Sequence, residues 1–457
     1  MSVAGAAAAK PIRRVLVANR GEIALRVIRA CRELGIETVA VYTEADRDAL
    51  PVRMADRRVC IGSARSTESY LNAPFIVSAA LTQGADAIHP GYGFLSEHAA
   101  FAAMCGDAGL VFIGPTPGVI RQMGDKAMAR RLAHEAGVPT TPGSEGALKD
   151  AADARIVADR IGYPVLLKAS AGGGGRGMRV VTKAAELAGA FADAAREAKS
   201  AFGDDAIYVE KYLTRVRHIE IQVLGDAADV LHFGERDCSA QRRNQKLVEE
   251  SPSPALTTDL RERLAAAAVK LCRHVGYTGA GTIEFILDQA SGQFYFMEMN
   301  TRIQVEHPVT EMVAGFDLVK AQLRIASGVG AGIAQRDIRL TGHAIECRIN
   351  AEDPGRNFAP SPGRVTRYHA PGGPGVRVDS HLYSGYEVPP FYDSLLAKVI
   401  CWGRDRDEAL ARMKGALSEL VVDGVKTTIP FHQRLLADPN FRRGDIHTQY
   451  VQETFLS

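Results

Sequence analysis

Polar residues alternate near the middle of the chain in a pattern that suits an ion or substrate site. Glu298, Asn300, Arg302 and Gln304 are two residues apart, so an extended chain would point them to one face. Glu284 stands among apolar residues in the preceding segment. Polar side chains on an otherwise apolar hairpin are costly unless ions or substrates satisfy them. The two carboxylates and the amide oxygen favour Mg²⁺ over zinc. A salt bridge between Glu298 and Arg302 is the alternative, and it accounts for one pair only.

Four consecutive glycines at residues 172–175 form the clearest loop signal. The run joins two predicted strands and opens no helix, so it is neither a Rossmann fingerprint nor a Walker loop. A glycine-rich hairpin tip can bring backbone N–H groups against phosphates, and Lys168 ends the strand that leads into it. The alternative is a flexible surface hairpin with a solvated lysine.

Two further segments carry polar residues in regular patterns. In residues 217–224, His218, Glu220 and Gln222 alternate with apolar residues, as in a half-buried strand, and a solvated polar face is the favoured interpretation for this segment alone. Residues 241–246 read Gln-Arg-Arg-Asn-Gln-Lys and are flanked by acidic residues. That setting suits the anchoring of a small anion better than the binding of nucleic acid.

The elements that must position these residues fall into three stretches. Strand-like segments separated by helical patterns predict a doubly wound, mostly parallel sheet over roughly the first 120 residues; the strands are expected at 13–17, 38–41, 59–61, 85–89 and 111–113. After a Pro/Gly-rich loop at 139–146 a small unit follows, which we expect to be a mobile lid; its strands are expected at 164–169, 178–181 and 206–210, and its long helix at 183–200. The remainder is strand-rich, with helices predicted at 258–275 and 406–420.

Composition excludes several classes of protein. With 457 residues the chain is too long for one core, and 46% hydrophobic with 24% charged residues is ordinary for a soluble globular protein. A net charge of +2 predicts no electrostatic attachment to nucleic acid or to a membrane surface, and no apolar run is long enough to span a bilayer. The seven cysteines are scattered without a Cys-x-x-Cys pair, which argues against a disulfide framework and favours a cytoplasmic location.

Taken together, the segments resemble the ATP-grasp superfamily and, within it, the biotin carboxylases. The resemblance rests on six separated stretches: Ala-Asn-Arg-Gly-Glu-Ile at 18–23, His-Pro-Gly-Tyr-Gly-Phe-Leu-Ser-Glu at 89–97, Gly-Gly-Gly-Gly-Arg-Gly-Met at 172–178, Glu-Arg-Asp-Cys-Ser at 235–239, Glu-Met-Asn-Thr-Arg-Ile-Gln-Val-Glu-His-Pro-Val-Thr-Glu at 298–311, and Pro-Pro-Phe-Tyr-Asp at 389–393. It implies an α/β (α+β) fold with a preATP-grasp N-terminal domain at 1–125, an ATP-grasp lid at 140–212, and a C-terminal ATP-grasp and biotin-carboxylase domain at 213–457.

The resemblance also implies roles for individual residues. Contacts to ATP are implied for Lys126, Lys168, Gly174, Gly175, Glu210, Lys211, Leu213, His218, Gln241, Asn244, Glu284, Ile286 and Glu298. The Mg²⁺ ligands would be Glu284, Glu298 and Asn300, and the bicarbonate contacts Lys246, Arg302, Gln304 and Val305. Glu306 looks like the catalytic base, and Tyr92 and Arg348 look like biotin contacts; Lys246, Arg302, Glu306 and Arg348 form the implied catalytic set. Asn244 departs from the pattern, because relatives usually carry histidine there.

The implied reaction is the carboxylation of biotin with ATP, bicarbonate and Mg²⁺ or Mn²⁺. Biotin is expected on a separate carrier protein, because Lys414, in the closest approach to a carrier motif, falls inside a predicted helix and the chain ends soon afterwards. Carboxyltransferase subunits and a homodimer are the other expected partners, and acetyl-CoA is the simplest final acceptor. An ATP-grasp ligase that activates a carboxylate for attack by an amine, and a non-catalytic ATP-binding protein, are the alternatives.

Overall fold

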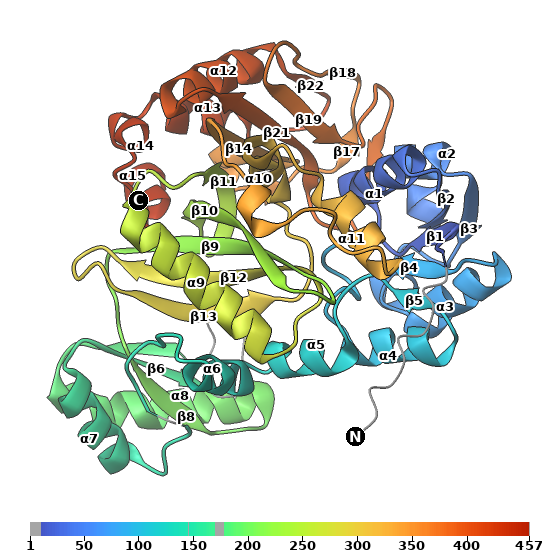
Figure 1. Ribbon diagram of the computed structural model, residues 1–457. Coiled ribbons are helices and arrows are strands. Elements are labelled where there is room, and N and C mark those ends of the chain that lie inside the picture. Colours follow the sequence, from blue (N-terminus) through green and yellow to red (C-terminus); the bar gives the residue numbers. More distant parts are fainter. Residues whose placement is uncertain (1–10, 145, 170–177, 457) are drawn as a thin grey trace. The chain divides into compact units, whose positions relative to one another are not determined.

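The computed structural model describes residues 11–144, 146–169 and 178–456, which form two compact units (Figure 1). The first unit comprises the described residues of Met1–Gly124, Arg217–Glu284 and Met299–Ser457, and the second comprises those of Asp125–Val216 and Phe285–Glu298. The chain therefore passes from the first unit to the second and back twice. The boundaries expected from the sequence, 1–125, 140–212 and 213–457, stay a prediction.

The N-terminal part of the first unit is built on a parallel sheet in the order β3-β2-β1-β4-β5. Its central strand is apolar after Arg14, and Val15, Leu16 and Val17 are fully buried, as expected for a parallel sheet covered on both faces. The doubly wound fold predicted for this region is confirmed. The elements are β1 (Arg14–Val17), α1 (Gly21–Glu33), β2 (Glu37–Tyr42), α2 (Leu50–Met54), β3 (Arg57–Cys60), α3 (Ala73–Thr82), β4 (Ala87–His89), α4 (Ala99–Asp107), β5 (Val111–Phe112) and α5 (Pro117–Gly124).

The larger sheet has eight strands in the order β13-β12-β9-β10-β11-β14-β21-β19. The pairings along β9, β10, β11, β14, β21 and β19 are antiparallel, which suits alternating side chains. The strands are β9 (Val216–Gly225), β10 (Val230–Arg242), β11 (Gln245–Ser251), β12 (Gly279–Asp288), β13 (Phe294–Asn300), β14 (His343–Asn350), β19 (Val376–Ser380) and β21 (Leu395–Gly403).

Helices cover both faces of this sheet at β14 and β21. Ile345 and Val399 belong to the core that includes Met413 of α12 (Arg406–Glu419). Ala344 and Ile400, one residue away on each strand, pack instead against α10 (His307–Ala314). Because successive residues of a strand point to opposite faces, residues 346, 348 and 398 share the α10 face. That face carries the candidate site.

Among its described residues, the second unit holds the antiparallel sheet β7-β6-β8 and three α-helices. Its elements are α6 (Lys126–Glu135), α7 (Ala151–Ile161), β6 (Val165–Ala169), β7 (Met178–Val181), α8 (Leu187–Phe202) and β8 (Ile207–Lys211). Lys168 of β6 pairs with Met178 of β7, so the two strands that flank the glycine run in the sequence are antiparallel. The predicted phosphate contacts Gly174 and Gly175 lie outside the described residues.

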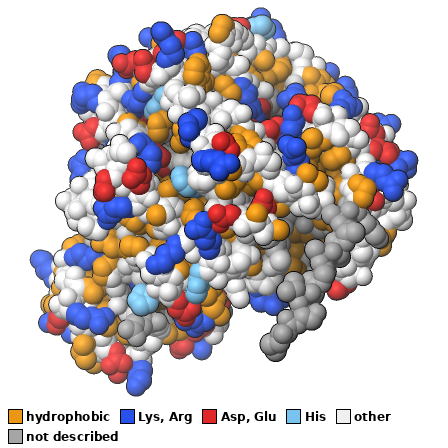
Figure 2. All heavy atoms as spheres, in the orientation of Figure 1, with side chains coloured by type: hydrophobic (Ala, Val, Ile, Leu, Met, Phe, Trp, Pro, Cys, Tyr) orange, Lys and Arg blue, Asp and Glu red, His pale blue; other side chains and the backbone are white. Residues whose placement is uncertain are grey.

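The other elements complete the C-terminal part of the chain. They are α9 (Thr258–His274), α11 (Leu318–Ala326), β15 (Glu352–Asp353), β16 (Ala359–Pro360), β17 (Gly363–Arg364), β18 (Arg367–His369), β20 (Glu387–Val388), β22 (Val421–Asp423), α13 (Ile429–Ala437), α14 (Pro439–Arg443) and α15 (Tyr450–Phe455). The helices predicted at 258–275 and 406–420 correspond to α9 and α12. Within the described residues, no helix has both the length and the apolar character needed to cross a bilayer. All seven cysteines are free thiols. Basic and acidic side chains are interspersed over the face seen in Figure 2.

A buried charge cluster beside α12 gives a pH-dependent contribution to stability. Glu250 accepts a hydrogen bond from Arg406 Nε (2.6 Å) and lies 2.7 Å from His343 Nε2. Burial by itself would raise the pKa of Glu250, but His343 and Arg406 outweigh burial and lower the pKa from 4.5 to about 2. The stabilisation is therefore present above about pH 4.5 and is lost as the pH falls toward about 2, and a shift of this size corresponds to on the order of 3 kcal/mol.

We expect Glu250→Gln to be less stable than the parent at neutral pH and to approach it as the pH falls. The measurement is the denaturant midpoint of both proteins at steps from pH 7 to pH 3. A stability difference that stays constant over this range would contradict the assigned pKa.

Candidate active site on the eight-stranded sheet

The candidate active site is assembled from five neighbouring strands of the large sheet. Glu284 comes from β12, Glu220 from β9, Arg236 from β10, Lys246 from β11 and Arg348 from β14. These strands follow one another in the sheet order although Glu220 and Arg348 are 128 positions apart in the sequence. The sheet thus brings together charged groups that the sequence keeps far apart.

Lys246 is the centre of the charge cluster. Its Nζ lies 2.6 Å from Glu220 Oε2, 2.8 Å from Glu284 Oε1 and 2.7 Å from Glu306 Oε1. Burial would lower the pKa of this amine, but the three carboxylates outweigh it and raise the pKa well above its usual value. Lys246 is therefore a fixed positive charge that the structure places beside the predicted base.

Glu306 precedes the first turn of α10 and is fully buried. Its Oε1 accepts a hydrogen bond from Lys246, and its Oε2 accepts one from Arg348 Nη2 (2.9 Å). Burial would raise the pKa of this carboxyl, but Lys246, Arg348 and Arg236 hold it well below its usual range. Glu306 is consequently ionised at neutral pH, as a proton acceptor must be.

Arg348 links Glu306 to a second buried carboxylate. Its Nε donates to Glu249 Oε1 (2.6 Å). Burial raises the pKa of Glu249 to about 7, although Arg348 acts in the opposite direction, and the charge of Glu306 adds to the rise. Tyr92, the other predicted biotin contact, donates its hydroxyl to Glu22.

Arg302 and Gln304 converge with Asn300, but not in the way the alternating pattern predicted. β13 ends at Asn300, so the prediction of an extended chain through Gln304 is wrong. The chain bends after Asn300, and Arg302 folds back to donate to Asn300 Oδ1 (2.8 Å, from Nη2) and Gln304 Oε1 (2.9 Å, from Nη1). Its Nε donates to Glu97 Oε2 (2.8 Å), which leaves the guanidinium fixed from three sides.

The strand face that carries His218, Glu220 and Gln222 is buried, so the interpretation of a solvated face is wrong. The reason is Arg236 on the adjacent β10, whose guanidinium pairs with Glu220 and donates to Gln222 Oε1 (2.7 Å). It also reaches Thr310 Oγ1 (2.9 Å) on α10. Sequence reasoning missed Arg236 as an individual residue; the only local signal was its place in the Glu-Arg-Asp-Cys-Ser stretch.

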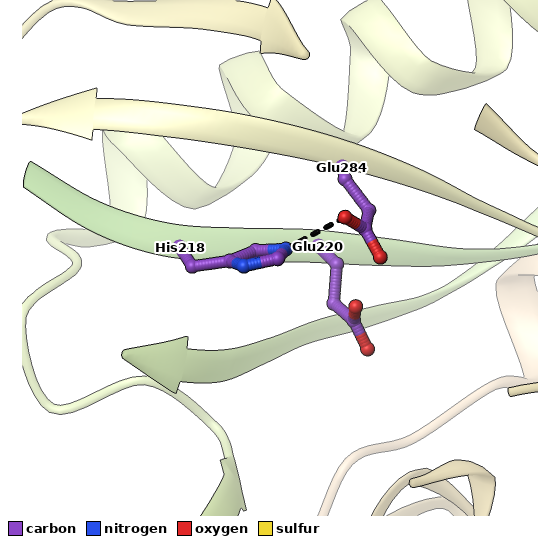
Figure 3. A group of neighbouring side chains, drawn as sticks. All are labelled: His218, Glu220 and Glu284. Carbon is purple, nitrogen blue, oxygen red and sulfur yellow. Dashed lines mark ion pairs between the residues drawn. The ribbon is translucent and has the colours of Figure 1, made fainter. Parts of the chain in front are cut away.

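Of the residues predicted to hold Mg²⁺, Glu284 and Asn300 lie close together in the first unit. Glu284, His218 and Glu220 offer ligand atoms that all lie within 4.8 Å of one another (Figure 3). His218 Nε2 is 2.9 Å from Glu284 Oε2, and Asn300 Nδ2 donates to Glu284 Oε1 (2.9 Å). Glu284 and Asn300 therefore fit an oxygen-ligand set, provided that the amide turns its oxygen toward the metal. Glu298 belongs to the second unit.

In the second unit, two predicted ATP contacts are already paired. Lys168 Nζ lies 2.5 Å from Glu210 Oε2, and Arg130 Nη1 lies 2.6 Å from the other oxygen of Glu210. Lys211 donates to the carbonyl oxygens of Gly162 and Tyr163, at 3.0 and 3.1 Å. The remaining predicted ATP contacts of this unit are Lys126, exposed at the start of α6, Leu213 after β8, and Ile286 and Glu298 on β12 and β13.

The hairpin between β10 and β11 explains the unusual Asn244. Arg243 and Asn244 form a two-residue turn with φ of 48° and 65°, which places both in the left-handed region. Two-residue hairpins of this type favour asparagine there. Gln241, at the base of the same hairpin, is buried. The phosphate contact of Asn244 stays a prediction.

The comparisons with known proteins agree with this architecture. Residues 11–120 match the family described as "Biotin carboxylase, N-terminal domain", residues 125–332 match "Carbamoyl-phosphate synthase L chain, ATP binding domain", and residues 346–453 match "Biotin carboxylase C-terminal domain". An ATP-binding domain between two biotin-carboxylase domains defines the class of protein.

Individual relatives match over almost their whole length. The chain is 58% identical over 441 residues to a biotin carboxylase of Nostoc sp., covering 96% of this chain and 98% of the relative. It is 55% identical over 441 residues to a pyruvate carboxylase subunit of Methanothermobacter thermautotrophicus, covering 96% and 89%. A solved structure of the biotin carboxylase domain dimer of the Hydrogenobacter thermophilus 2-oxoglutarate carboxylase, with MgADP, ADP and bicarbonate, is similar with a TM-score of 0.90 at 53% identity, covering 97% of this chain and 98% of that one. The chain belongs to the biotin carboxylase family.

Proposed function

We propose that this protein carboxylates biotin on its ureido nitrogen, at the expense of ATP and with bicarbonate as the carbon source. The observation that carries the proposal is the pairing of Glu306 with both Lys246 and Arg348, at 2.7 and 2.9 Å. This pairing supports an ionised base that would lie between a cation for bicarbonate and a cation for the ureido oxygen of biotin.

The first step is the activation of bicarbonate. Lys246 and Arg302 would hold the anion by charge-assisted hydrogen bonds. Bicarbonate would share Lys246 with Glu306, and this sharing would weaken the interaction that holds the pKa of Glu306 low. Glu306 would then take the bicarbonate proton while the bicarbonate oxygen attacks the γ-phosphorus of ATP, giving carboxyphosphate and ADP.

A divalent metal ion completes the charge balance around the phosphates. Glu284, Glu298 and Asn300 are the residues that we propose to hold Mg²⁺. When bound, the ion would neutralise charge on the transferring phosphoryl group.

The second step transfers the carboxyl group. Carboxyphosphate would split into CO₂ and phosphate, and the phosphate would remove the proton from the biotin nitrogen that attacks CO₂. Arg348 would stabilise the enolate-like ureido oxygen, as an oxyanion hole does. Because carboxyphosphate hydrolyses readily, water must be excluded, a role that we assign to the predicted lid at 140–212.

The test of the proposed function is ATP cleavage measured with and without bicarbonate and free biotin. We expect ADP release to depend on bicarbonate, and carboxybiotin to form when biotin is added. A ligase that joins a carboxylate to an amine would instead cleave ATP without bicarbonate when given its own substrates. Bicarbonate-independent cleavage would therefore contradict the proposal.

We further propose that biotin reaches this site on a separate carrier protein. The closest approach to a carrier lysine, Lys414, lies in the middle of α12, with the neighbouring Met413 in the core. A long arm attached to a packed helix could not swing between two sites. We expect a streptavidin blot of the purified protein to show no biotin, and free biotin to be carboxylated slowly because it lacks the contacts and the tethering of a carrier. A biotin label on Lys414 would contradict the separate carrier.

The proposed reaction also requires further partners. We propose a cytoplasmic homodimer that works with carboxyltransferase subunits. Relatives named above act in pyruvate and 2-oxoglutarate carboxylases. Acetyl-CoA is the acceptor that we propose for this chain, and the acceptor is set by the carboxyltransferase.

A further inference from the structure

Lys398 is a buried lysine with no role in the reaction proposed above. It lies on β21, directly across from Arg348 of β14, and its side chain is 0% exposed. Its Nζ donates to the carbonyl oxygen of Val305 (2.8 Å) and lies 3.1 Å from Glu22 Oε1. Burying an ammonium group costs several kcal/mol unless it is paired and hydrogen-bonded, so these two partners define what the residue does.

The two partners of Lys398 belong to opposite ends of the proposed site. Val305 immediately precedes the base Glu306 and is itself a predicted bicarbonate contact. Glu22, on α1, is buried and accepts the hydroxyl hydrogen of Tyr92 on the same oxygen that faces Lys398. A continuous chain therefore runs from Tyr92 through Glu22 and Lys398 to the backbone beside Glu306.

Asp379, another carboxylate near Lys398, is not its main partner. Asp379 lies 4.0 Å from Nζ and is already held by Arg377, from Nε at 3.0 Å and from Nη2 at 2.8 Å. The pairing with Glu22 balances the charge of Lys398, and the hydrogen bond to Val305 connects it to the segment that carries Glu306. The hydrogen bond to Val305 is one of the contacts that hold the bend carrying Gln304, Val305 and Glu306, and it is the one that connects this bend to Lys398.

We propose that Lys398 is a positioning residue that couples the biotin end of the site to the bicarbonate end, through the chain Tyr92–Glu22–Lys398–Val305. Biotin bound at Tyr92 would alter the hydrogen bond to Glu22, and Lys398 would pass the change to the segment that carries Glu306. This inference deepens the proposed function and rests on it.

The sharpest test is Tyr92→Phe, which removes one hydroxyl at the biotin end and leaves every charge paired. In the biotin carboxylation assay we expect the KM for bicarbonate, a substrate that Tyr92 is not proposed to contact, to rise about threefold or more, with the KM for ATP unchanged. Lys398→Met should lower kcat about tenfold or more, because small displacements of reacting groups are costly. Lys398→Arg, which keeps the charge and a donor, should recover part of the loss.

A double-mutant cycle separates coupling from general damage. If the residues act through one chain, Tyr92→Phe should add little to the loss caused by Lys398→Met. Arg406→Met is the matched control, because it also removes a cation from a buried carboxylate, Glu250, at 2.6 Å but touches no proposed site residue. We expect it to lower stability and leave the KM for bicarbonate unchanged.

Failure of the coupling and failure of the proposed function give different results. An unchanged KM for bicarbonate in Tyr92→Phe, or fully additive losses in the double variant, would overturn the coupling even though the parent carboxylates biotin. If Lys398→Met does not fold, Tyr92→Phe alone decides. A parent protein without bicarbonate-dependent carboxylation would overturn the proposed function itself, and the coupling with it.

Discussion

Glu306→Gln is expected to bind ATP normally but to lose bicarbonate-dependent turnover by about 100-fold or more. Glutamine has nearly the same shape as glutamate but cannot accept a proton at neutral pH. The native carboxylate is kept ionised by Lys246 and Arg348, which the structure places at 2.7 and 2.9 Å. The substitution therefore removes the proton acceptor and leaves the backbone at the start of α10 in place. The measurement is the steady-state rate of ADP release with saturating bicarbonate, beside nucleotide binding measured by calorimetry.

Glu235→Gln is the matched control for this prediction. Glu235 is equally buried on the same sheet and paired with Arg261 at 2.8 Å, but contacts no proposed site residue. We expect its turnover to stay within about twofold of the parent at temperatures where it is folded. Turnover of Glu306→Gln close to that of this control would remove Glu306 from the role of base.

Arg236→Met is expected to cause the largest loss of stability of any single substitution considered, about 3–5 kcal/mol. The guanidinium is fully buried, pairs with Glu220, and donates to Gln222, Thr282 and Thr310. Removing it leaves Glu220 paired with Lys246 at 2.6 Å and takes a hydrogen-bond donor away from the other three acceptors. The measurement is the free energy of unfolding of the first unit, which contains Arg236 and Trp402. It is obtained from a urea titration in which the fluorescence of Trp402 is monitored.

The control for this prediction is the more exposed pair of Arg261 and Glu235. The side chain of Arg261 is 29% exposed, so water can replace part of what Arg261→Met removes. We expect a much smaller loss there, and we expect Glu220→Gln combined with Arg236→Met to cost less than the sum of the two single substitutions. A loss below about 1 kcal/mol for Arg236→Met would contradict the prediction, because it would show that water replaces the interactions of the buried guanidinium.

The fold class and most elements could be predicted because their signals are local. The continuous apolar run of β1 and the helical spacing of α1 directly indicate a buried parallel strand and its helix. The strands around residues 170–177 and the helices α9 and α12 were predicted within a few residues of their observed ends. The candidate site residues could be named from the sequence because the family motifs carry them, although their roles remain proposals.

The sequence alone thus determined the succession of elements, the family and the residue types available for chemistry. The tertiary structure decided which of those residues meet. The alternating polar face of β9 looked solvated, because nothing in that segment indicates that Arg236 and α10 will cover it. The contact of Arg302 with Glu97, the three carboxylates around Lys246 and the contact of Lys398 with Val305 likewise join positions far apart in the chain. The physical reason is that burial and charge pairing depend on which strands become neighbours in the sheet, and a local pattern does not contain that information.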